Sequence, residues 1–390
     1  MKLKHLFILF AALPGLCSPG RAQNPASVSS NGLRTVTLTS PHRPSIIFVQ
    51  CDGLGDGDLS CYGQSHFQTP NIDRLAADGI RFTSYSAGAF AGAPASASLM
   101  LGQDAVHVQQ RADAVVPLAP DAITVAQLLR QAGYHTGLIG EWNLGDENSS
   151  GAPWKMGFEE FAGYLDAKDA ANFYADYMWR YAPRSIYNTT NRQMDTFMGR
   201  EPLASNRTGE RREFIPDLLT KAAVNFIKVN QPDQFNHFRP FFLMLNYKIP
   251  GDSGSPVPTD APFSDEKWPQ PAKNEAAMMV RLDGYIGQLL EQLQKLGLTN
   301  DTAVFFTSAT PPKKSDAATS SFFHAAVASN DLRVPMIVCW PGHAPAGTVS
   351  DFKWSAQDFL PTAAAMGSAK APPESTGTSA LSVLLGRPTK

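Results

Sequence analysis

The stretch SIIFVQCDGLGDGD, residues 45–58, decides how this chain folds. Its first six residues are almost continuously apolar, which is typical of a strand buried on both faces of a sheet. Three glycines and three aspartates follow at once, beginning with Asp52. In parallel sheets, ligands bind beyond the carboxyl ends of the strands. The stretch therefore predicts a central strand that ends at a functional edge.

The same succession of apolar strand and amphipathic helix recurs along the chain. Strands alternating with helices indicate an α/β fold, with a mostly parallel central sheet and helices on both faces. The segment 151–212 is rich in aromatic residues but has no clear period, and we expect it to be an irregular insertion over the same edge. The predicted helices cover residues 69–79, 123–133, 217–229 and 274–296, and the further strands cover 136–139, 241–247, 302–308 and 334–340.

Composition and the first residues limit the class of protein. The chain has 390 residues, 43% of them hydrophobic, and a formal net charge of −2, so it lacks the basic excess of a nucleic-acid-binding protein. Two lysines, a short apolar run and small residues predict a signal peptide over 1–22, cleaved near Ala22, and residues 23–43 read as a flexible leader. The run is too short to span a bilayer. We expect a periplasmic or secreted protein without a membrane span in its mature form.

The cysteines give no sign of a metal site. Removal of the signal peptide leaves Cys51, Cys61 and Cys339, an odd number, so at least one thiol is unpaired. Their spacing matches no zinc motif. We interpret them as small hydrophobic residues.

Five motifs together resemble the sulfatase family, within the alkaline-phosphatase-like superfamily. They are GDLSCYG (57–63), TPNIDRLAADGIRFT (69–83), GEWNLG (140–145), LRVPMIVCWPGHAPAGTVSD (332–351) and DFLPT (358–362). The resemblance implies a sulfatase-like domain over 44–385. Members of the family usually continue into a smaller C-terminal subdomain, which we expect to be largely absent here.

The resemblance also implies a chemistry. The family hydrolyses sulfate esters with a formylglycine nucleophile, made from Cys or Ser in a C/S-x-P-S-R motif. It binds calcium through three aspartates and an asparagine, and basic residues surround the sulfate. Aligned with these motifs, Asp52 is the one metal ligand that remains. The positions that depart from the family pattern are Gly92 at the nucleophile, Ser96 at the arginine, Glu141 at a lysine, Asn143 and Gly251 at histidines, and Gly53, Ala309 and Thr310 at the other metal ligands; His324 is the nearest counterpart of a second lysine.

These departures predict a site that has lost its chemistry. Calcium prefers about six to eight oxygen ligands, and one carboxylate is too few to hold it. Glu141, which has no evident partner in the sequence, would repel a sulfate by about 4 kcal/mol at about 4 Å and an effective dielectric near 20. We expect no cofactor, and a catalytically inactive pseudosulfatase that binds a glycan or a protein partner.

Two alternatives stay open. One is an active sulfuric-ester or phosphoric-ester hydrolase with a rearranged metal site, built from Asp52, Asp56, Glu141 or His107. The other is an altered copy without a selected function.

Overall fold

The computed structural model describes residues 43–108, 110, 115–188, 193–250, 256–312, 323 and 331–387. The predicted signal peptide, nearly all of the leader, Gly251 and His324 lie outside these residues. No helix within the described ranges is both long and apolar enough to cross a membrane.

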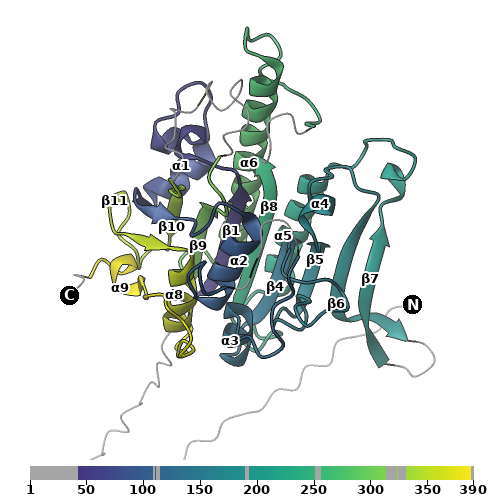
Figure 1. Ribbon diagram of the computed structural model, residues 1–390, viewed down its shortest axis with the longest axis vertical. Coiled ribbons are helices and arrows are strands. Elements are labelled where there is room, and N and C mark those ends of the chain that lie inside the picture. The colour runs from purple at the N-terminus through teal and green to yellow at the C-terminus, as the bar shows by residue number, and fades with distance from the viewer. Residues whose placement is uncertain are drawn as a thin grey trace, which may run out of the picture. The chain divides into compact units, whose positions relative to one another are not determined.

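A central sheet organises the described part of the chain, and ten of its strands pair there in the order β11-β2-β10-β9-β1-β8-β4-β5-β6-β7 (Figure 1). Strands β9, β1, β8, β4 and β5 are parallel, whereas β10, β6 and β7 each run antiparallel to a neighbour. The predicted α/β fold with a mostly parallel sheet is confirmed. The strands are β1 Ser45–Asp52, β2 Ile80–Phe82, β3 Tyr85–Ser86, β4 His135–Glu141, β5 Glu160–Tyr164, β6 Tyr177–Asn188, β7 Gln193–Pro202, β8 Phe241–Pro250, β9 Thr302–Ser308, β10 Met336–Cys339, β11 Thr348–Ser350 and β12 Trp354–Ser355.

Strand β1 lies between β8 and β9 and carries the core on both of its faces. Ile46 and Phe48 pack with α2, α3 and α8, while Ile47 and Val49 pack with α1, α5 and α6 (Figure 1). Burying such a side chain contributes about 1.5–3 kcal/mol, which is why the strand has no polar face. The helices are α1 Pro70–Ala77, α2 Gly92–Leu101, α3 Val125–Gln131, α4 Ala167–Ala170, α5 Ile215–Val229, α6 Gln270–Lys295, α8 Phe359–Met366 and α9 Leu381–Leu384.

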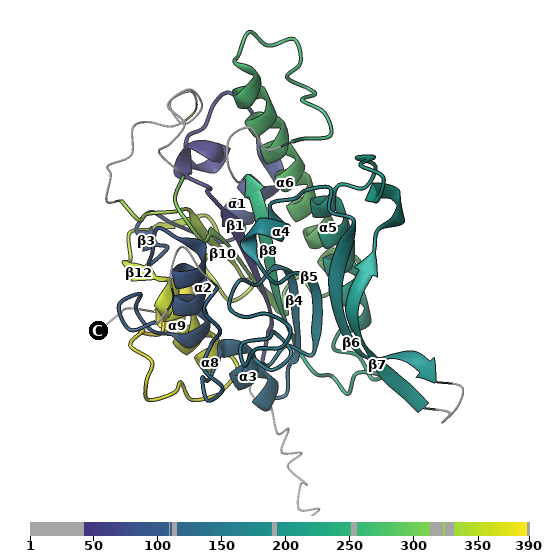
Figure 2. The same ribbon diagram turned by 45° about the vertical axis from the view of Figure 1, so that its right-hand side comes forward.

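The expectation of irregular structure over 151–212 was wrong. This segment supplies β5, α4, and the β6–β7 hairpin that extends the sheet to its edge (Figure 2). Met178 packs into one core and Trp179 into the other, so both faces of β6 carry apolar side chains there. An apolar and polar alternation, the usual sign of a strand, is therefore missing from the sequence.

Helix starts follow from local chemistry and from one long-range contact. Helix α6 begins four residues before the predicted start, because Pro271 suits a first helical turn. Helix α1 begins at Pro70, and the carboxylate of Asp283 on α6 accepts hydrogen bonds from the backbone nitrogens of Asn71 and Ile72, both at 2.9 Å. A carboxylate at a helix N-terminus accepts hydrogen bonds from the free backbone N–H groups there and interacts favourably with the helix dipole.

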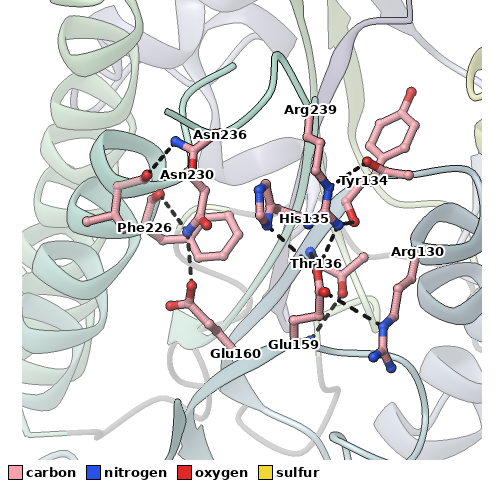
Figure 3. A network of polar contacts seen from close by, with 12 residues as sticks. Arg130, Tyr134, His135, Thr136, Glu159, Glu160, Phe226, Asn230, Asn236 and Arg239 are labelled. Atoms are coloured by element: carbon pink, nitrogen blue, oxygen red, sulfur yellow. Dashed lines mark hydrogen bonds and ion pairs between the residues drawn. The ribbon is translucent and has the colours of Figure 1, made fainter. Parts of the chain in front are cut away.

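A polar network fastens the amino ends of β4 and β5 (Figure 3). Glu159 is its centre, with Arg239 at 3.4 Å, Arg130 at 3.7 Å and His135 at 3.8 Å. Arg239 also donates to the carbonyl of Tyr134 at 2.8 Å. These contacts lie at the end of β4 opposite Glu141, so they hold the sheet without entering the candidate site.

Candidate functional site

A small pocket opens at the carboxyl ends of β1, β4, β8 and β9, beside the start of α2. Its volume of about 20 Å³ has room for about one water molecule. The parallel direction of these four strands is what brings their last residues to one edge. The lining residues are Gln50, Cys51, Asp52, Gly92, Ser96, Glu141, Asn246, Tyr247, Lys248 and Ala309.

Asp52 is buried at the end of β1, and both of its carboxylate oxygens have partners. Lys248 Nζ lies 2.6 Å from Oδ2, and the Thr310 hydroxyl donates to Oδ1 at 2.6 Å. The Thr310 Oγ1 in turn accepts from the backbone nitrogen of Gly53 at 3.1 Å. The loops after β1 and β9 are thus joined through one threonine hydroxyl.

Glu141 has a partner that the sequence did not reveal. Lys248 Nζ lies 3.3 Å from its Oε2, so the expected lone carboxylate is half of an ion pair. Burial raises the pKa of Glu141, although the ammonium of Lys248 opposes this shift. The two carboxylates raise the pKa of Lys248 against the effect of burial, which keeps the lysine charged.

Lys248 lies on β8, between the strands β1 and β4 that end in the two carboxylates, and the pairing of β8 with β1 is irregular at this point. From Gln50 to Asp52, β1 advances two residues, while β8 advances four, from Asn246 to Pro250. Extra residues of this kind locally break the ladder and re-aim a side chain. The Asn246 amide closes the arrangement by donating to the Glu141 carbonyl at 2.9 Å.

Lys248 is the site residue that our sequence analysis missed. The available signal was a single basic residue near the end of FFLMLNYKIP, an otherwise apolar strand. Lysine is rarely buried unless it is paired, so a lysine near the end of an apolar strand was informative.

The start of α2 supplies no reactive group. Gly92 is its first residue and lines the pocket, and a Cβ atom added there would meet nothing within 4 Å. Ser96 also lines the pocket, and 9% of the residue is exposed. The hydroxyl of Ser98 donates to the carbonyl of Gln103, just after the C-terminal end of α2.

Other residues singled out in the sequence lie elsewhere. Asn143 follows β4 in a left-handed conformation (φ 58°) and does not line the pocket, a placement that asparagine tolerates well. Asp58 accepts from the backbone of Gly55 at 2.8 Å within a turn, and burial raises the pKa of Asp56. His107 is exposed and pairs with Asp104 at 2.7 Å.

No group of three or more His, Cys, Asp or Glu side chains in the described part of the chain is placed to hold a metal ion. Cys51, Cys61 and Cys339 are free, and Cys51 and Cys339 are buried.

Comparison with known proteins agrees with this fold. A model of the Sulfatase family matches residues 44–368. Arylsulfatase A from Bos taurus is 29% identical over 354 residues, which cover 86% of this chain and 66% of the relative. N-acetylgalactosamine-6-sulfatase from Rattus norvegicus is 27% identical over 373 residues, covering 90% and 67%. The chain therefore spans about two thirds of the length of these relatives.

Among solved structures, that of Ps i-CgsB in complex with k-i-k-neocarrahexaose superposes with a TM-score of 0.69 at 26% identity, covering 87% of this chain and 75% of the other. The family match extends over most of the sequence and includes every strand that lines the pocket. The chain belongs to the sulfatase family of the alkaline-phosphatase-like superfamily.

Proposed function

We propose that this protein does not hydrolyse sulfate esters and that it acts by binding an oligosaccharide. Gly92 carries the proposal. It stands where the resemblance places the nucleophile, at the start of α2 and at the wall of the pocket, and it has no side chain that could be oxidised or could attack. Covalent catalysis needs a nucleophile with a base to activate it.

The contacts of Asp52 support the same conclusion for the calcium that the family implies. Both carboxylate oxygens are already engaged, one of them by an ammonium group. A divalent ion about 4 Å from that ammonium would be repelled by about 8 kcal/mol at an effective dielectric near 20. The residues present therefore do not fit calcium, and no step of a reaction is assigned to it.

An oligosaccharide is the ligand class that the surroundings of the pocket favour. Glu141 pairs with Tyr164 in the sheet, and the Tyr164 hydroxyl donates to the Tyr177 carbonyl, so the aromatic segment begins next to the site. The guanidinium of Arg200 lies 4.5 Å from the ring centre of Tyr177. Tyrosine faces suit sugar rings, and guanidinium groups suit anionic substituents. The complex of the similar Ps i-CgsB with a neocarrahexaose supports this class.

Hydrolysis is tested with 4-nitrophenyl sulfate, with and without added calcium. We expect no release of 4-nitrophenol above the uncatalysed rate. Saturable turnover that disappears in Asp52→Ala would refute the proposal.

Binding is tested by calorimetry with k-i-k-neocarrahexaose. We expect Arg200→Ala to weaken binding about tenfold, the loss of roughly 1.4 kcal/mol. Arg74→Ala, which removes an exposed guanidinium on α1, is the matched control and should leave binding unchanged. No binding by the unaltered protein would reject the ligand class.

We also propose that the protein is exported. The mass of the mature chain from an exporting host should then correspond to a start at Gln23. A full-length chain retained in the cytoplasm would contradict this prediction.

A further inference from the structure

Lys248 is the only cationic side chain among the residues that line the described pocket. Its Nζ lies 2.6 Å from Asp52 and 3.3 Å from Glu141, and only a fifth of its side chain is exposed. Asp52 is the position that the resemblance aligns with a calcium-binding aspartate. A cation thus lies against the family's metal-binding carboxylate, and it is part of the chain.

The chain on either side holds this lysine in place. Tyr247 is buried, with its hydroxyl 2.5 Å from the Thr220 hydroxyl on α5 and its ring stacked on Tyr285 of α6 at 5.7 Å. Ile249 is fully buried. Because side chains alternate along a strand, anchoring both neighbours in one core turns Lys248 toward the other side.

The place of β8 between β1 and β4 in the sheet brings the ammonium of Lys248 to both carboxylates. The extra residues of β8 lie between Asn246 and Pro250, and Lys248 is one of them. A regular continuation of the ladder from Gln50 and Asn246 would set Lys248 opposite Asp52, whereas the irregularity pairs Asp52 with Pro250.

We propose that Lys248 is a tethered cation that takes the place of the family's calcium and makes the folded protein independent of divalent metal. The ammonium supplies positive charge to the two carboxylates at the strand ends, as a bound ion would. Unlike an ion, it is not exchanged with solvent, since it is covalently part of β8. Asp52 and Glu141 consequently keep their positions in any calcium concentration.

This inference goes beyond the proposed function and can fail separately from it. Turnover of 4-nitrophenyl sulfate would refute the proposed function and would say nothing against a lysine at the cation position. A saturable calcium requirement for stability would refute the tethered cation alone.

The first experiment measures thermal unfolding and calcium binding of the mature protein. We expect the Tm to differ by no more than about 1 °C between excess EGTA and roughly 10 mM calcium, since only a ligand that binds the folded state shifts it. Calorimetry should detect no stoichiometric calcium binding. A calcium-dependent rise of about 3 °C or more with one ion bound would overturn the inference.

The second experiment removes the charge. Lys248→Met keeps the length of the side chain and leaves two buried carboxylates without their cation, so we expect the Tm to fall by about 5–10 °C. Lys221→Met is the matched control: Lys221 is exposed on α5 and forms no ion pair with the described residues, and its replacement should change the Tm by about 1 °C or less.

A double variant keeps the test decisive if Lys248→Met does not fold. Adding Glu141→Gln removes one of the two uncompensated carboxylates, so Lys248→Met/Glu141→Gln should fold and recover roughly half of the lost Tm. If Lys248→Met is as stable as Lys221→Met, or if the second substitution recovers nothing, the lysine is not the cation of this site.

Discussion

Replacing Glu141 by glutamine tests whether burial or ion pairing governs the carboxylate at the end of β4. The substitution keeps the size and the hydrogen-bonding oxygen of the side chain but removes its charge. Lys248 keeps its shorter contact with Asp52 at 2.6 Å, so the lysine does not become an unpaired buried charge.

The structure sets the sizes of the competing effects. At 3.3 Å and an effective dielectric of about 20, the attraction between Lys248 and Glu141 is about 5 kcal/mol before desolvation. Burial of an ion costs several kcal/mol, so the two nearly cancel. The pKa of Glu141 is raised, with burial as the largest cause, which means that desolvation exceeds the attraction.

The raised pKa of Glu141 sets the sign of the pH dependence of stability. A carboxyl whose pKa is raised in the folded state stabilises the fold fully below its unfolded pKa, about 4.3, and this contribution is lost as the pH rises through the folded pKa. Glu141→Gln removes this loss. Compared with the unaltered protein, the variant should gain about 1 kcal/mol or more at pH 8 and little at pH 4.5.

The assay is guanidinium chloride unfolding followed by tryptophan fluorescence at both pH values. Glu266→Gln is the control, because Glu266 is exposed and has no ion pair among the described residues, and its replacement should change neither value. A Glu141→Gln protein that is less stable than the unaltered one by about 1 kcal/mol at pH 8 would show that the ion pair prevails over burial.

Three further substitutions test the fold around the site. Gly92→Ala should stabilise the protein by about 0.5–1 kcal/mol in chemical unfolding, because the added Cβ would meet no atom within 4 Å. Gly140→Ala should instead destabilise it by about 3 kcal/mol or more, since φ is 111° and the added Cβ would lie 1.8 Å from a carbonyl oxygen of β8. Equal effects of the two substitutions on stability would contradict this geometry. Burial, and after it the charge of Arg239, lowers the pKa of His135 below its usual value near 6.5, so the unaltered protein loses stability as the pH falls from about 6.5 through that lowered pKa. In melting curves between pH 7 and pH 5, the Tm of His135→Gln should therefore fall less than that of the unaltered protein. An identical fall in Tm for both proteins would contradict this prediction. Asp283→Ala leaves the donors at the start of α1 unsatisfied and should cost about 2–3 kcal/mol, and a change under about 0.5 kcal/mol would mean that solvent replaces the carboxylate.

The order of secondary structure could be predicted wherever one physical pattern prevailed. Strands β1, β8 and β9 are apolar because both faces are buried, and the helices between them show one apolar face. The hairpin β6–β7 escaped prediction because aromatic and basic side chains occupy both of its faces. The pairing of β6 with β5 joins residues that are 16 or more positions apart, such as Gly163 and Trp179, and local patterns do not report it.

The candidate site also combines features that the sequence predicts with one that it does not. The sequence by itself determined which groups are missing, because a glycine at residue 92 has no side chain in any conformation. It also predicted that Asp52 and Glu141 each follow a strand of the same mostly parallel sheet. Only the tertiary structure decided that Lys248 lies between them, since that contact depends on the place of β8 between β1 and β4 in the sheet. Charge balance in a buried site depends on distances of a few ångströms, and those are set by strand register and not by residue type.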